Sequence, residues 1–143
     1  MAVAEVRRLM RAPVEVVQET VEDPARLARL SVIRSVRVLR EGARGPRSVG
    51  TLRRLHLGLF WMDETVLALS PGRFDYHIRL SVPGFRHEAG RITFEAAGEG
   101  VTRVTWYSRF TLRPSLLERL GGAVGRAGFR IVLRSLDRAV RLP

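Results

Sequence analysis

The C-terminal segment, residues 114–143, has the sequence PSLLERLGGAVGRAGFRIVLRSLDRAVRLP. Ser115 and Glu118 have the spacing of a capping box, which satisfies free backbone N–H groups at the start of a helix. Arginines at every fourth position from Arg126 to Arg138 are expected to face solvent. The segment is therefore predicted to form one long amphipathic helix over about 115–141. The apolar residues that recur at helical spacing are Leu117, Leu120, Val124, Ala127, Ile131, Leu136 and Ala139.

Glycines are concentrated in the first half of this predicted helix, at Gly121, Gly122, Gly125 and Gly128. Each glycine inside a helix costs about 1 kcal/mol relative to alanine, so the cluster requires a reason. One reason would be the close approach of another backbone. The other would be open space beside the helix that a ligand can occupy, and this second interpretation is the one we favour.

Length and composition limit the classes of protein to which the chain can belong. With 143 residues, a single domain over 1–143 is expected. The absence of cysteine excludes disulfides, thiol catalysis and cysteine-ligated metals. The N-terminus has no apolar stretch typical of a signal peptide, and the longest apolar run, 57–62, is too short to span a bilayer. We expect a cytoplasmic protein without a transmembrane segment.

The chain is strongly basic, with a net charge of +11, and all of its basic residues are arginine. A nucleic acid or an anionic membrane is the partner that such a charge suggests. The arginines are nevertheless spread from Arg7 to Arg141, and no nucleic-acid recognition motif is present. Specific nucleic-acid binding is therefore not expected.

The order of the predicted elements indicates an α+β fold. Alternating and β-branched segments predict strands at 2–11, 32–41, 49–57, 64–69, 74–82, 88–96 and 102–110. Pro13 and the pair Asp23-Pro24 are helix-start signals, so two short helices are expected at about 13–21 and 24–30. Consecutive strands joined by short turns form an antiparallel meander. Only the long helix is large enough to cover one face of this sheet.

Three segments carry a resemblance to a known family: RAPVEVVQETVEDPARLARL (11–30), PGRFDYHIRL (71–80) and EGVTRVTWYSRF (99–110). Together with the chain length and the order of elements, they resemble the START-like, or SRPBCC, superfamily and its polyketide cyclase/dehydrase-like branch. The resemblance implies a helix-grip fold, in which a seven-stranded curved antiparallel sheet wraps around a long C-terminal helix and two short helices follow strand 1. Family members bind lipids, sterols, polyketides or plant hormones, and some are enzymes. The family has no universal catalytic residue that could be transferred.

Strand alternation also predicts where a ligand would enter. Turns at 42–46, 70–73 and 98–100 are short and rich in glycine, as expected at a closed end. The turns near 58–61 and 83–86 are expected at the other end, together with the starts of the first and last helices. This end carries Leu59, Phe60, Trp61 and Phe85, and large apolar residues on turns suggest the mouth of a cavity. The candidate ligand-binding residues are Trp61, Tyr76, Ile78, Phe85, Phe94, Trp106, Ser108, Gly121, Val124, Gly125 and Gly128.

Two carboxylates are weak candidates for acid/base chemistry in such a cavity. Glu64 or Glu88 in an apolar pocket could have a raised pKa and transfer a proton. Alternation with Ile92 and Phe94 places Glu88 inward and His87 outward. The alternative is that both glutamates are rim charges paired with arginines. The His and Glu residues of this region lack the fixed spacing of metal ligands, so no metal site is predicted.

Three functional hypotheses follow from the sequence. The first is a domain that binds a hydrophobic small molecule, with no cofactor, in a cavity between the sheet and the last helix. The second is a cyclase/dehydrase-type enzyme acting on a polyketide-like substrate in the same cavity. The third is an interaction module in which Gly121 and Gly125 form a helix-packing face, although this spacing is informative mainly in membranes. The ligand and the oligomeric state, a homodimer included, stay open.

Overall fold

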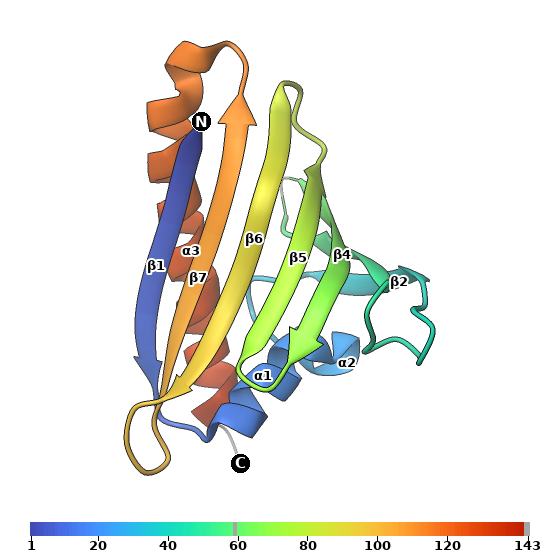
Figure 1. Cartoon of the computed structure of the whole chain (residues 1–143), viewed down its shortest axis with the longest axis vertical. Coiled ribbons are helices and arrows are strands. Elements are labelled where there is room, and N and C mark those ends of the chain that lie inside the picture. Colours follow the sequence, from blue (N-terminus) through green and yellow to red (C-terminus); the bar gives the residue numbers. More distant parts are fainter. Residues whose placement is uncertain (59, 142–143) are drawn as a thin grey trace.

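The computed structural model describes residues 1–58 and 60–141; Leu59, Leu142 and Pro143 lie outside the described residues. One antiparallel sheet has the strand order β1-β7-β6-β5-β4-β3-β2, and the long helix lies along one of its faces (Figure 1). The predicted helix-grip architecture is confirmed. The elements are β1 (Ala2–Met10), α1 (Val14–Glu22), α2 (Pro24–Leu27), β2 (Ser35–Arg40), β3 (Leu52–His56), β4 (Trp61–Ser70), β5 (Arg73–Leu80), β6 (Phe85–Ala96), β7 (Thr102–Leu112), the short 3₁₀ helix η1 (Ser115–Leu117) and α3 (Glu118–Arg141).

Strand alternation determines which face of the sheet is buried. On β5, Phe74, Tyr76 and Ile78 are buried, while the residues between them are more exposed. On β7, Trp106 shares the buried face with Ser108 and lies opposite Val6 of β1. Because side chains on a strand point alternately to opposite faces, these residues form the layer that meets the helices.

The helix starts are only partly as predicted. Asp23 accepts a hydrogen bond from the Ala25 backbone N–H at 3.0 Å, as expected of a cap. The capping box at Ser115 is wrong, because Ser115 opens η1 and its carbonyl accepts from the Glu118 backbone N–H. The Glu118 carboxylate instead contacts the amino group of Met1 at 2.6 Å. The long helix is thus joined to the first strand at its N-terminus.

The orientation of α3 differs from the sequence prediction in its first half. Leu120 and Val124, expected on the buried side, are 62% and 61% exposed. Ile131, just beyond the middle of the helix, was also expected to be buried and is 51% exposed. Leu133 and Leu136, in the second half, are buried. The helix is rotated so that its glycine-rich side faces β1 and β7, which leaves Leu120 and Val124 largely exposed.

The glycines of α3 explain this rotation. A Cβ on Gly125 would lie 3.3 Å from the Ala4 Cβ, and one on Gly121 would overlap the Leu112 side chain. Among the four glycines of α3, Gly128 alone has no atom within 4 Å of where a Cβ would be. In the direction of a Cβ, the favoured interpretation of open space fits Gly128 alone, because side chains of the sheet occupy that position at Gly121 and Gly125.

The first helix lies at the opposite end of the sheet from the start of α3, which corrects the sequence expectation. Gln18 of α1 donates to the Ser70 carbonyl at 2.8 Å, and its amide oxygen accepts from the Gly72 N–H at 2.8 Å. These contacts hold α1 against the β4–β5 turn. The reason is that β1 is antiparallel to β7, so the helices that follow these two strands begin at opposite ends (Figure 1). Among the described residues, no helix is long and apolar enough to cross a membrane.

Candidate ligand-binding cavity

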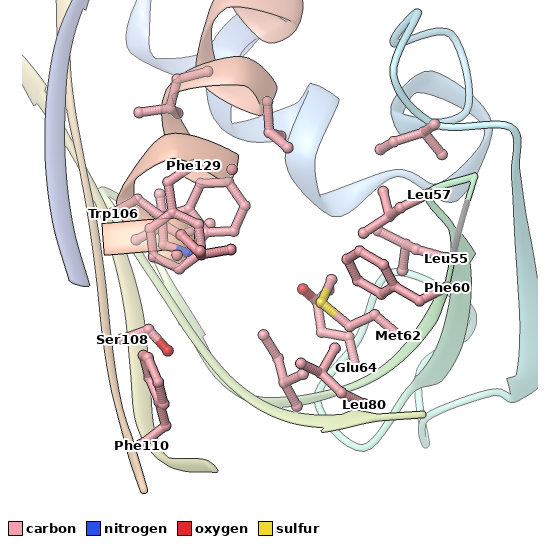
Figure 2. Close-up of a pocket in the computed structure, with 18 of the residues that line it drawn as sticks. Leu55, Leu57, Phe60, Met62, Glu64, Leu80, Trp106, Ser108, Phe110 and Phe129 are labelled. Carbon is pink, nitrogen blue, oxygen red and sulfur yellow. The ribbon is translucent and has the colours of Figure 1, made fainter. Parts of the chain in front are cut away.

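A cavity of about 400 Å³ lies between the sheet and α3 (Figure 2). Its volume is within the range of small-molecule sites, and its walls are almost entirely apolar. Phe60, Val82 and Val124 line it and are 40%, 42% and 61% exposed, so they mark its opening. The opening lies between the β3–β4 loop, the β5–β6 turn and the start of α3. Leu59, which the sequence also placed here, lies outside the described residues.

Most of the candidate residues line this cavity. The closed end is formed by residues that the sequence reasoning missed, among them Val21 of α1 and Leu27 of α2. Phe129 was also missed; its ring stacks on Trp106 with centroids 4.1 Å apart. Leu55 of β3 and Met62 of β4 also line the cavity and lie opposite each other in the sheet. Alternation along these two strands could have identified them. The candidates that line the cavity are Glu64, Ile78, Phe85, Trp106, Ser108, Gly121, Val124, Gly125 and Gly128.

Trp61 does not line the cavity. It is the first residue of β4, a strand that begins earlier than predicted. The next residue, Met62, points into the cavity, so Trp61 lies on the other face of the sheet. There the Arg54 guanidinium lies 4.2 Å from the centroid of its ring. The neighbouring Phe60 occupies the opening in its place.

Glu88 was predicted to point inward and His87 outward, and the structure shows the reverse. A β-bulge between His87 and Ala89 shifts the register of β6 against β7. A bulge adds one residue, so alternation counted from Ile92 fails beyond it. His87 is buried, whereas Glu88 lies away from the cavity and contacts Arg86 at 3.7 Å.

Tyr76 and Phe94 point inward but lie in the packed core rather than at the cavity surface. The Tyr76 hydroxyl accepts a hydrogen bond from the Trp106 indole N–H and donates to the Tyr107 carbonyl at 3.1 Å. Burial raises the pKa of Tyr76 well above its ordinary value. A Cβ at Gly90 would overlap the Tyr76 ring, so this glycine makes room for the tyrosine. Tyr76 thus supports the wall that Trp106 forms.

A buried ion pair forms one polar position of the cavity wall. Arg53 of β3 lies directly opposite Glu64 of β4, and its Nε donates to Glu64 Oε1 at 2.7 Å. The two side chains are only 1% and 5% exposed. Arg53 also donates to the Glu22 carbonyl at 3.0 Å, and its guanidinium lies 5.3 Å from the Phe74 ring centroid. Glu64 is therefore a carboxylate with a bonded counter-ion, and the sequence reasoning had assigned Arg53 no role.

A second polar position is formed by His87 and Ser108. The Ile78 backbone N–H donates to His87 Nδ1 at 3.2 Å, and His87 Nε2 lies 2.8 Å from Ser108 Oγ. Burial, with a smaller contribution from His77, lowers the pKa of His87 to about 4. Because Nδ1 accepts from a backbone amide, the proton of the neutral ring is on Nε2 and points at Ser108. His87 therefore cannot take a proton from Ser108, as a general base for a nucleophilic serine would have to do.

Solved structures with a similar fold are numerous and distant in sequence. A START superfamily protein from Mycobacterium smegmatis matches with a TM-score of 0.82 at 12% identity, covering 99% of this chain and 98% of that one. The Zhui aromatase/cyclase from Streptomyces sp. R1128 matches with a TM-score of 0.75 at 17% identity, and the match covers 97% of this chain and 93% of that one. DynU16, from the dynemicin biosynthetic locus, matches with a TM-score of 0.75 at 21% identity. The match covers 99% of this chain but 48% of DynU16, so this chain spans about half the length of that protein.

No match was found among curated proteins. The family model for polyketide cyclase/dehydrase and lipid transport proteins matches residues 1–141, nearly the whole chain. This match agrees with the helix-grip fold and with the resemblance noted in the sequence. The chain belongs to the polyketide cyclase/dehydrase and lipid transport family.

Proposed function

We propose that this protein binds a hydrophobic small molecule, such as a lipid or a polyketide-like compound, in the cavity between the sheet and α3. The observation that carries the proposal is an apolar cavity of about 400 Å³ with an opening to solvent. Transfer of an apolar molecule from water into such a cavity is favourable because it removes apolar surface from water. The polar positions at Glu64 and Ser108 would orient the ligand within walls that are otherwise apolar.

A cavity-filling variant tests this proposal. Gly128 has open space beside it and lines the cavity, so Gly128→Leu should occupy part of the volume. Ala127 is its neighbour and is exposed, so Ala127→Leu is a matched control. The measurement is uptake of Nile red, a neutral hydrophobic dye, followed by its fluorescence. We expect Gly128→Leu to abolish uptake and Ala127→Leu to retain it, both variants being checked for folding by circular dichroism.

Two results would reject the binding function. One is the absence of dye uptake by the folded wild-type protein, together with the absence of any co-purifying small molecule in native mass spectrometry. The other is equal uptake by the wild type and by Gly128→Leu. Equal loss in both leucine variants would show that the dye binds to the outer surface of α3 instead.

An enzyme of the cyclase/dehydrase kind is the second candidate, and the buried Arg53–Glu64 pair at the cavity wall is the observation in its favour. In this case Glu64→Gln should abolish turnover of a polyketide-type substrate and change ligand affinity by less than about tenfold. Glu88→Gln is the matched control, because Glu88 points away from the cavity, and it should keep full activity. Full activity in Glu64→Gln would remove Glu64 from any catalytic role.

A further inference from the structure

The bulge in β6 creates an unusual buried contact between the sheet and a histidine ring. The ladder between β5 and β6 runs from Arg73 opposite Thr93 to Tyr76 opposite Gly90. Beyond this point, the Ile78 N–H donates to the His87 ring rather than to a strand carbonyl. The ring is 4% exposed and thus satisfies a backbone group that the bulge would otherwise leave unpaired.

This contact fixes the direction of the next hydrogen bond. A backbone N–H can only donate, so His87 Nδ1 holds a lone pair and Nε2 carries the ring proton. The pair at 2.8 Å is therefore a donation from His87 Nε2 to Ser108 Oγ. Protonation of Nδ1 would place two N–H groups against each other. The low pKa of His87, about 4 because of burial, keeps the ring in this neutral form at neutral pH.

Ser108 is consequently left with its own hydroxyl hydrogen to donate. Its oxygen already accepts from His87. Burial raises the pKa of Tyr76 and the neighbouring Ser108 hydroxyl partly offsets this, but within the described residues the two hydroxyls do not meet at hydrogen-bond geometry. The hydroxyl of Tyr76, another member of this buried network, is bonded to Trp106 and Tyr107. Ser108 is only 3% exposed, yet it lines the cavity, and Figure 2 shows its oxygen directed toward the interior.

We propose that Ser108 donates a hydrogen bond to an uncharged oxygen acceptor of the bound molecule, so that the cavity selects apolar compounds carrying a ketone or ester over hydrocarbons of the same shape. This inference rests on the proposed binding function. His87 acts through Ser108 as a positioning residue. Anions are disfavoured, because Arg53 is already paired with Glu64 and a charged group loses its hydration on entering apolar walls.

The test compares ligands of similar size that differ in one group. Hexanophenone, hexylbenzene and 6-phenylhexanoate are each used to displace Nile red from the full chain. A net hydrogen bond corresponds to about two- to tenfold in affinity, so the wild type should prefer the ketone to the hydrocarbon by this factor. Ser108→Ala should abolish the preference and leave hexylbenzene affinity unchanged. Ser81→Ala, at an exposed serine outside the cavity lining, should keep it.

His87 is tested by the same ratio of affinities. His87→Gln can still accept from the Ile78 N–H and donate toward Ser108, so the preference for the ketone should be retained. His87→Leu can do neither. In the folded fraction of this variant, the ratio of ketone to hydrocarbon affinity should fall toward one. Equal ratios in the two variants would remove His87 from the proposal.

The outcomes separate this inference from the binding function. Equal affinity of the wild type for the ketone and the hydrocarbon, or an unchanged preference in Ser108→Ala, would overturn the role of Ser108 and leave the binding function intact. Tightest binding of 6-phenylhexanoate would also overturn it and would point to Arg53 as the anchor. Failure of all three compounds to displace the dye would reject the binding function itself.

Discussion

The two halves of α3 contact the same sheet in different ways. In the C-terminal half, Leu133 and Leu136 are buried, and Asp137 accepts hydrogen bonds from Arg8 and Arg141. In the N-terminal half, Gly122 is the buried residue, and the side of the helix that faces the sheet is rich in glycine.

The C-terminal half of α3 therefore contributes mainly to stability, and the N-terminal half borders the space proposed for the ligand. The C-terminal half fills the space above the sheet with side chains, as a core requires. The N-terminal half approaches β1 closely through Gly125 and leaves a volume open beside Gly128. A helix with large residues along its whole length could not do both. Mutations in the two halves should therefore have different effects.

The largest difference is expected between Leu136→Ala and Leu120→Ala, the same substitution in the two halves. Leu136 is 2% exposed, so its truncation should reduce the free energy of unfolding by about 2–5 kcal/mol. Leu120 is 62% exposed, and its truncation should change stability by less than about 0.5 kcal/mol. Urea unfolding measures both values. Equal losses would show that the two halves are packed alike.

Acid should reduce the free energy of unfolding through protonation of His87. Its pKa in the folded protein is about 4, below the ordinary 6.5, so the unfolded chain binds this proton more tightly. Stability from this group is complete above pH 6.5 and is lost as the pH falls toward 4, by up to about 3 kcal/mol. The measurement is urea unfolding of wild type and His87→Gln between pH 4 and 7. Parallel pH profiles for the two proteins would contradict the prediction.

The anchor at Asp137 should contribute more than the contact at the other end of the helix. Asp137 is 2% exposed and bonds to Arg8 at 2.9 Å, so Asp137→Asn should cost about 1–3 kcal/mol. Glu118 contacts the Met1 amino group, which is half exposed, and Glu118→Gln should cost less than about 1 kcal/mol. Thermal unfolding at low salt compares the two. A larger loss for Glu118→Gln would reverse the assignment of the anchoring end.

The smallest effects distinguish the glycines. Gly128→Ala should stabilise the protein by about 0.4–1 kcal/mol, since a methyl group meets no atom within 4 Å and the unfolded chain loses entropy. Gly125→Ala should give less or no gain, because its methyl group would lie 3.3 Å from Ala4 Cβ. Shifts of the unfolding midpoint measure both. A greater gain at Gly125 would show that close packing is not why glycine is present there.

The sequence by itself determined the architecture of this protein. Alternation in segments such as 74–82 and 102–110 predicted the antiparallel strands, and the 3.6-residue period predicted the long helix. These patterns are local, because strand and helix geometry fix the repeat of side-chain directions along the chain. The general position of the opening, near Phe60 and Phe85, followed from the same alternation.

Only the tertiary structure decided which side of α3 faces the sheet and which polar groups meet in the cavity. Apolar periodicity favoured Leu120 and Val124 as buried residues, but close packing of Gly125 against Ala4 set the rotation of the helix. The bulge after His87 reversed the alternation that had placed Glu88 inward. The pairing of Arg53 with Glu64 depends on strand register. Register, bulges and helix rotation are set by contacts between distant segments, and no local repeat in the sequence encodes them.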